Sequence, residues 1–170
     1  PCNALNQKYG NLPSGSMVWF VNKVAREFPD KIISNLAYWY TRAAPSNIVA
    51  EPNVNIMLCN IESTREKPVF DTDPAFTSDL QDWGKMSQDI LIWDYNIQFA
   101  NPVCPFPNLH TIGPNIKFYI QNNVRALFMQ ATGNKGEFDH LRAYLITKLM
   151  WNPNADPNLI INDFLHGYYG

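Results

Sequence analysis

Ile90-Leu-Ile-Trp-Asp-Tyr95 is the stretch that decides the fold, because it is an almost continuously apolar run that ends in a carboxylate and a phenol. A short run of this kind is typical of a strand buried on both faces, as in a parallel sheet. Three other runs have the composition of strands and cover residues 31–40, 54–61 and 124–130. The last three of the four strands begin at 54, 90 and 124, which is the spacing of consecutive βα units.

Apolar residues at helical spacing fill most of the intervals between these strands. A helix is also expected before the first strand, where Met17, Phe20, Val21, Val24 and Phe28 have helical spacing behind a serine N-cap. Further helices are expected over 76–86, over 112–122, over the stretch marked by Phe138, Leu141, Leu145 and Leu149, and after the N-cap pair Asp156-Pro157. The stretch 41–52 predicts no helix, and residues 133–136 predict a turn.

The pattern predicts an α/β protein with four parallel strands and flanking helices, in a single domain over residues 1–170. Four parallel strands alone leave two open sheet edges, which proteins normally cover or close. We therefore interpret the chain as part of a (β/α)8 TIM-type barrel that pairs with a missing half or with a second copy of itself.

Composition and charge limit the classes of function. The formal net charge is −2 and no basic stripe is present, which argues against nucleic acid as a partner. No apolar run approaches the ~18 residues of a membrane span, so membrane insertion is not expected. The histidines His110, His140 and His166 are scattered, and no glycine-rich phosphate loop is present, so neither a metal nor a cofactor is expected.

Polar and aromatic residues follow each predicted strand, at the point where function gathers in a parallel barrel. Tyr38, Tyr40, Trp93 and Tyr95 could form a stacking platform for the flat C–H faces of sugar rings, with Tyr38 and Tyr95 facing the ligand. Gln130 and Arg42 lie at strand ends where they could bind hydroxyl groups. The alternative for these residues is core packing between strands and helices, with Gln130 as a buried, hydrogen-bonded amide.

Two carboxylates at strand ends are the catalytic candidates. Asp94 follows an apolar strand directly, and burial against a helix layer without a partner would cost several kcal/mol, so we expect its side chain to point into the barrel mouth. Glu62 is the candidate for the second carboxylate that glycosidic cleavage usually needs. The alternatives are a hydrogen-bonded Asp94 that fixes a loop, and a solvated Glu62 beside Arg65 or Lys67.

Several short motifs together resemble a bacterial domain family that was first defined without an assigned function. They are Phe20-Val-Asn-Lys-Val-Ala25, Leu36-Ala-Tyr38, Leu58-Cys-Asn-Ile-Glu62, Ile92-Trp-Asp-Tyr95, Pro105-Phe-Pro-Asn-Leu109, Leu141-Arg-Ala-Tyr-Leu145 and Phe164-Leu-His-Gly-Tyr-Tyr-Gly170. Members of that family are periplasmic or extracellular proteins with a glycoside hydrolase-type barrel. The family is similar to family 20 hexosaminidases and α-glucuronidases, and part of it is assigned to family 163 endo-β-N-acetylglucosaminidases.

The resemblance implies that the chain is the C-terminal half of the barrel, with about strands five to eight. It also implies that the principal acid pair of the parent enzyme lies just upstream of Cys2. The expected function is therefore a glycoside hydrolase-like barrel that acts on glycans, possibly containing N-acetylhexosamine, in which this chain supplies part of the sugar-binding rim and is inactive alone. The alternatives are a non-catalytic glycan-binding module and a structural half-barrel that dimerises.

Overall fold

The computed structural model describes residues 2–131 and 136–170, and a four-stranded parallel sheet forms its centre. The strands are β1 (Ile33–Ala37), β2 (Val54–Cys59), β3 (Ile90–Tyr95) and β4 (Val124–Gln130), and they lie in the order β1-β2-β3-β4. Each neighbouring pair runs parallel. The predicted α/β class and the four parallel strands are thus confirmed.

The first strand is shorter than the run 31–40 predicted. After Ala37 the backbone turns at Tyr38 into the 3-10 helix η1 (Trp39–Thr41), where Trp39 has a φ of 50°. The Thr41 side chain accepts a hydrogen bond from the Tyr38 backbone N–H at 3.2 Å, so a local polar contact ends the strand before its aromatic residues. No α-helix follows before β2, as the stretch 41–52 predicted.

The helices lie before, between and after the strands. They are α1 (Cys2–Lys8), α2 (Pro13–Glu27), α3 (Val69–Thr72), α4 (Pro74–Met86), α5 (Leu109–Gln121), α6 (Asp139–Trp151) and α7 (Pro157–Tyr169). The five predicted helices are present as α2, α4, α5, α6 and α7, with bounds that differ by a few residues, whereas α1 and α3 were not predicted. Positions 133–135 of the predicted turn lie outside the described residues.

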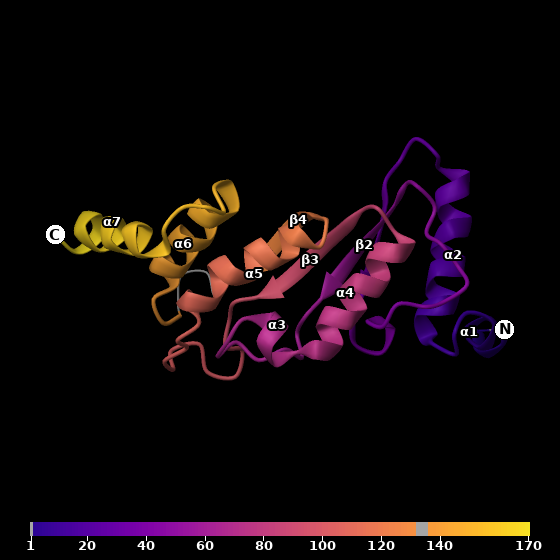
Figure 1. Ribbon diagram of the computed structural model, residues 1–170, viewed down its shortest axis with the longest axis horizontal. Helices are drawn as coiled ribbons and strands as arrows, with labels where there is room; N and C mark the ends of the chain where they lie inside the picture. The colour runs from indigo at the N-terminus through magenta and orange to yellow at the C-terminus, as the bar shows by residue number, and fades with distance from the viewer. Residues whose placement is uncertain (1, 132–135) are drawn as a thin grey trace.

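The apolar core lies between one face of the sheet and the helices. Figure 1 shows α3, α4 and α5 side by side along the sheet, with α1 and α2 at one end of the molecule and α6 and α7 at the other. Ile90 and Ile92 of β3 are buried against α4 residues such as Leu80 and Trp83. A second cluster joins α5, α6 and α7 through Ile116, Leu145 and Ile160 among others. No helix within residues 2–131 and 136–170 is long and apolar enough to span a membrane.

The other face of the sheet carries exposed apolar side chains. Side chains alternate along a strand, so the face opposite Ile92 presents Leu36, Trp93 and Phe128. Leu36 is 45% exposed and Phe128 is 48% exposed. Parallel sheets are normally covered on both faces. We call this surface the open face, and its residues are Leu36, Tyr38, Met57, Cys59, Leu91, Trp93, Tyr95, Ala126, Phe128 and Gln130.

Candidate functional site

The residues predicted to bind ligand meet at the carboxyl ends of the strands but divide between the two faces of the sheet. Tyr38, Trp93, Tyr95 and Gln130 belong to the open face. Asp94 lies on the helix-covered face, in line with Ile90 and Ile92. The strand-end positions predicted from the sequence are therefore present, but they do not form one convergent group.

An aromatic cluster lies on the open face at the end of β3. The rings of Trp93 and Tyr95 stack with centroids 5.8 Å apart and planes 14° apart. Phe128 of β4 contacts the Trp93 ring edge to face at 4.8 Å. The Trp93 indole Nε1–H donates to the Gln130 side-chain oxygen at 2.9 Å, which fixes the plane of the indole. We call Trp93, Tyr95, Phe128 and Gln130 the aromatic shelf.

A neutral pair adjoins this shelf. The Cys59 thiol and the Tyr95 hydroxyl are neighbours on β2 and β3, and both residues are buried. Burial raises the pKa of the Cys59 thiol to about 11, although its hydrogen bond with Tyr95 acts in the opposite direction. Burial also raises the pKa of Tyr95 above its ordinary value. Both groups are thus protonated at neutral pH, and Cys59 is not an activated nucleophile.

The prediction that Asp94 points into the barrel mouth is wrong. Its side chain is 2% exposed and accepts hydrogen bonds from the Asn60 amide at 2.9 Å and from the Tyr119 hydroxyl of α5 at 3.1 Å. These two donors replace the water that burial removes, so the desolvation cost does not force the carboxylate outward. Burial and the neighbouring Asp94 charge raise the pKa of Tyr119 well above its usual range, which keeps the phenol a hydrogen-bond donor.

Arg65 binds backbone carbonyls at the carboxyl ends of β2 and β3. Its Nε donates to the Tyr95 carbonyl at 2.8 Å, and one Nη donates to the Asn60 carbonyl at 2.9 Å. Strand ends leave carbonyl groups without ladder partners, and a guanidinium has enough donors to bind several of them. Burial lowers the pKa of Arg65, and the nearby Asp94 carboxylate opposes that shift. Asp94 and Arg65 therefore form a buried polar network beneath the rim.

Arg42 and Glu62 lie in a separate acidic cluster. Arg42 Nε donates to Asp79 of α4 at 2.8 Å, and its Nη1 lies 3.4 Å from the Glu62 carboxylate and 3.6 Å from Asp73. Burial raises the pKa of Asp79 despite this guanidinium. Glu62 is exposed and pairs with Arg42, rather than with Arg65 or Lys67. The two catalytic candidates, Glu62 and Asp94, thus have different partners and different surroundings.

A fully buried arginine, Arg142 of α6, anchors the loop that follows β3. Arg142 is 1% exposed and donates to the Asn108 side-chain oxygen at 3.0 Å and to the Phe106 carbonyl at 3.0 Å. Asn108 in turn donates to the Asn96 side-chain oxygen at 3.1 Å. Arg65, Tyr119 and Arg142 were not predicted from the sequence as residues of these networks. Asn60 could have indicated the network, because it is a polar residue directly after β2. Helix residues such as Tyr119 gave no such indication in the sequence.

Metal-binding chemistry has no support in the described part of the chain. No group of three or more His, Cys, Asp or Glu side chains there has an arrangement that could hold a metal ion. The arrangement provides a rigid aromatic surface with amide and hydroxyl groups at its rim, which suits recognition of a flat, hydroxyl-bearing ligand.

Comparison with known proteins identifies a family and no individual relative. No curated protein matches the chain. No solved structure matches it. One family model matches residues 1–170, and the chain therefore belongs to the family described as a domain of unknown function (DUF4838).

Proposed function

We propose that this chain is one half of a parallel (β/α)8 barrel, and that the aromatic shelf is part of the rim where the barrel binds a glycan. The open face supports the first part of the proposal. In a closed barrel this face would be the packed interior, and Leu36 and Phe128 would lose the exposure that they have here.

The outer edge of β1 supports the same architecture. A cavity of about 630 Å³ lies beside it and is lined by α1, α2 and the end of β1, including Met17, Phe20 and Leu36. Phe20 is exposed there although it belongs to a helix that covers the sheet. A further strand paired with β1 would cover Phe20 and would satisfy the backbone groups at this edge. The resemblance to glycosidase barrels agrees with such a strand.

The observation that carries the glycan proposal is the stacked Trp93–Tyr95 pair beside Gln130 on the open face. Apolar C–H faces of a sugar ring stack on aromatic rings, and its hydroxyl groups need nearby donors and acceptors. The Gln130 amide and the Tyr38 hydroxyl are of that kind. The resemblance supports N-acetylhexosamine-containing glycans as the ligand class and a periplasmic or extracellular location.

The role proposed for this half is to bind and orient the sugar. Asp94 is engaged beneath the sheet by Asn60 and Tyr119, and Glu62 is paired with Arg42. The carboxylates that a glycoside hydrolase needs across the scissile bond would accordingly come from the rest of the barrel. Catalysis by the complete protein therefore remains part of the proposal, with Asp94 and Glu62 in structural roles.

Glycan binding by the full-length native protein tests this proposal. We expect Trp93→Ala to raise the Kd for an N-acetylglucosamine-terminated oligosaccharide at least ~10-fold, because it removes a stacking surface worth about 1.5 kcal/mol. Isothermal titration calorimetry would measure the Kd. The control is Trp151→Ala at the end of α6, where Trp151 is 91% exposed and far from the shelf.

Trp93 is partly buried, so its replacement could also unfold the rim. Gln130→Ala keeps the rings and removes the amide donors together with the oxygen that fixes the Trp93 indole, and thermal unfolding would report the stability of both variants. Unchanged binding in both folded variants would overturn the glycan proposal, as would equal weakening by Trp151→Ala.

A second candidate function is a structural half-barrel that dimerises through its open face. The bare edges of β1 and β4 favour it, because neither edge strand pairs with a further strand among the described residues. In that arrangement a second copy, and not a longer chain, would cover Leu36 and Phe128.

A further inference from the structure

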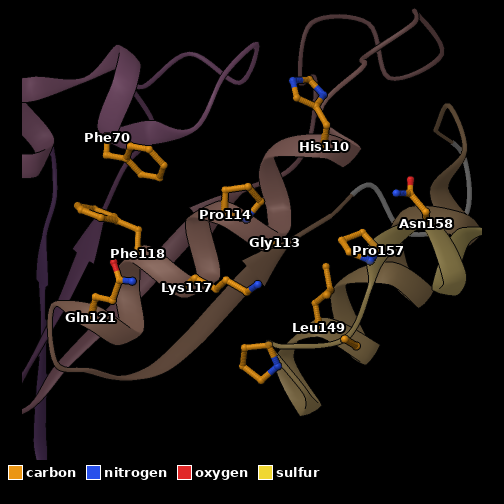
Figure 2. A pocket seen from close by; sticks show the side chains of 12 residues that line it. Phe70, His110, Gly113, Pro114, Lys117, Phe118, Gln121, Leu149, Pro157 and Asn158 are labelled. Carbon is orange, nitrogen blue, oxygen red and sulfur yellow. The ribbon is translucent and has the colours of Figure 1, made fainter.

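A cavity of about 530 Å³ lies on the helix-covered side, between α3, α5 and the start of α7. Figure 2 shows its lining side chains, with Phe70 and Phe118 on one side, Leu149 and Pro157 on the other, and Lys117 between them. The volume is within the range of small-molecule sites, which is about 300–1,000 Å³. The aromatic shelf is on the opposite face of the sheet, so the two sites are separate.

The walls of this cavity are apolar and fixed. The rings of Phe70 and Phe118 lie 5.2 Å apart at an angle of 46°, and Leu149 is buried. Gly113 lies against the start of α7 and against α6, since a Cβ at this position would be in ordinary van der Waals contact, 3.6 Å from Pro157 Cγ and 3.7 Å from Leu149 Cδ1. The cavity therefore presents a preformed surface for a compact apolar group.

The charge of the lining is positive. Lys117 and His110 are the basic residues among the lining side chains, and no aspartate or glutamate lines the described cavity. Lys117 forms no salt bridge with the described residues, and in Figure 2 its ammonium group points toward the α6–α7 side. A chain with a net charge of −2 thus has a locally cationic cavity.

Two neighbouring groups define how an anion would be held. His110 Nε2 lies 2.9 Å from the Glu66 carbonyl oxygen, so this nitrogen is occupied and Nδ1 is the remaining ring nitrogen. The Asp156 carboxylate caps α7 by accepting from the Asn158 backbone N–H at 2.8 Å, which offsets the partial positive charge of that helix end. Lys117 is therefore the principal cation for a ligand in this cavity.

We propose that this cavity binds a small organic carboxylate with an aromatic or branched apolar body. The body packs against Phe70, Phe118 and Leu149, and the carboxylate pairs with Lys117 at the edge of the apolar surface. Charge-assisted hydrogen bonds are stronger than neutral ones, so the carboxylate and its neutral amide are distinguished by Lys117. Completion of the barrel through the open face leaves this cavity accessible, because the cavity is on the outer helix layer.

Phenylacetate and its neutral counterpart phenylacetamide are suitable probes. Each would be titrated into the 15N-labelled full-length native protein, with amide shifts of residues 110–121 as the signal. We expect phenylacetate to bind at least ~10-fold more tightly than the amide, the difference of one hydrogen bond to a charged group. Lys117→Gln should remove this preference, whereas Lys23→Gln on α2, at the other end of the molecule, should preserve it.

The result that overturns the proposal is equal binding of the acid and the amide, or a preference that survives Lys117→Gln. Shifts confined to residues outside α5 and α7, or no shift in the millimolar range, would overturn it as well. Lys117 is exposed, so its replacement leaves the fold intact, and each outcome is independent of glycan binding at the aromatic shelf.

Discussion

At the scale of single residues, the buried ionisable groups of this protein fall into two kinds. Asp94 remains in a buried site because Asn60 and Tyr119 donate to it. Cys59 is different, because burial raises the pKa of its thiol to about 11 and the thiol stays protonated at neutral pH. Asp94 therefore stabilises the fold through its hydrogen bonds, whereas the neutral Cys59 thiol leaves the open face without a buried charge at this position.

The Cys59 pKa makes stability dependent on pH in the alkaline range. The folded-state pKa of about 11 is above the ordinary value of 9.0, so the folded state retains a proton that the unfolded state loses. Stability is therefore full below pH 9 and falls between pH 9 and pH 11, by about 2–3 kcal/mol from this group. Urea unfolding under reducing conditions should show a smaller loss over this range for Cys59→Ala than for the native sequence.

The tyrosines provide the control for this measurement. Tyr119 also has a raised pKa and titrates in both proteins, so its contribution cancels in the difference between the two curves. The difference reports Cys59 together with its effect on Tyr95, because Cys59 helps to raise the pKa of Tyr95. Curves that remain parallel from pH 8 to pH 11 would contradict the assignment.

At the scale of elements, α7 is the least supported helix of comparable length. Ile160 is its buried residue, whereas α5 buries six residues. The Asp156 side chain accepts from the Asn158 backbone N–H, and Pro157 occupies the first turn, as the Asp-Pro pair predicted. The N-cap accordingly contributes a large part of the stability of α7, because the helix makes few tertiary contacts.

Hydrogen exchange can measure this dependence on the cap. We expect Asp156→Ala to reduce the local stability of α7 by about 1 kcal/mol and to speed amide exchange in α7 by roughly fivefold, with little effect in α5. The matched control is Asn162→Ala on an exposed position of the same helix. Exchange in α7 that responds equally to both variants would show that the cap has no special role.

At the scale of the whole molecule, the open face is the main departure from a self-sufficient fold. A parallel sheet with one bare face and two bare edges is expected to associate with something that covers it. We expect residues 1–170 expressed alone to bind the dye ANS and to self-associate in light scattering. Phe128→Lys should reduce both signals, whereas Trp151→Lys, which changes an exposed residue at the end of α6, should reduce neither.

The two proposed architectures differ in the full-length protein. In a longer chain that completes the barrel, both ANS binding and self-association would be absent. A half-barrel that dimerises would have the mass of a dimer in light scattering and would not bind ANS. A monomer of residues 1–170 without ANS binding would contradict both.

Local sequence pattern was enough to predict the strands, most helices and the edge of the sheet where polar residues gather. Runs such as 90–95 are strongly apolar, and the strand spacing leaves room for little besides crossover helices. It also identified Tyr38, Trp93, Tyr95 and Gln130 as residues of one rim. These features follow from local pattern and from the alternation of side chains along a strand.

The contacts of each rim residue depend instead on how distant segments pack together. Asp94 was assigned to the wrong face because its two donors, Asn60 and Tyr119, lie 34 and 25 residues away in the chain. Arg65 binds carbonyls of two strands for the same reason. Hydrogen-bond satisfaction in a buried site depends on partners from distant segments, and no local pattern encodes which of them arrive.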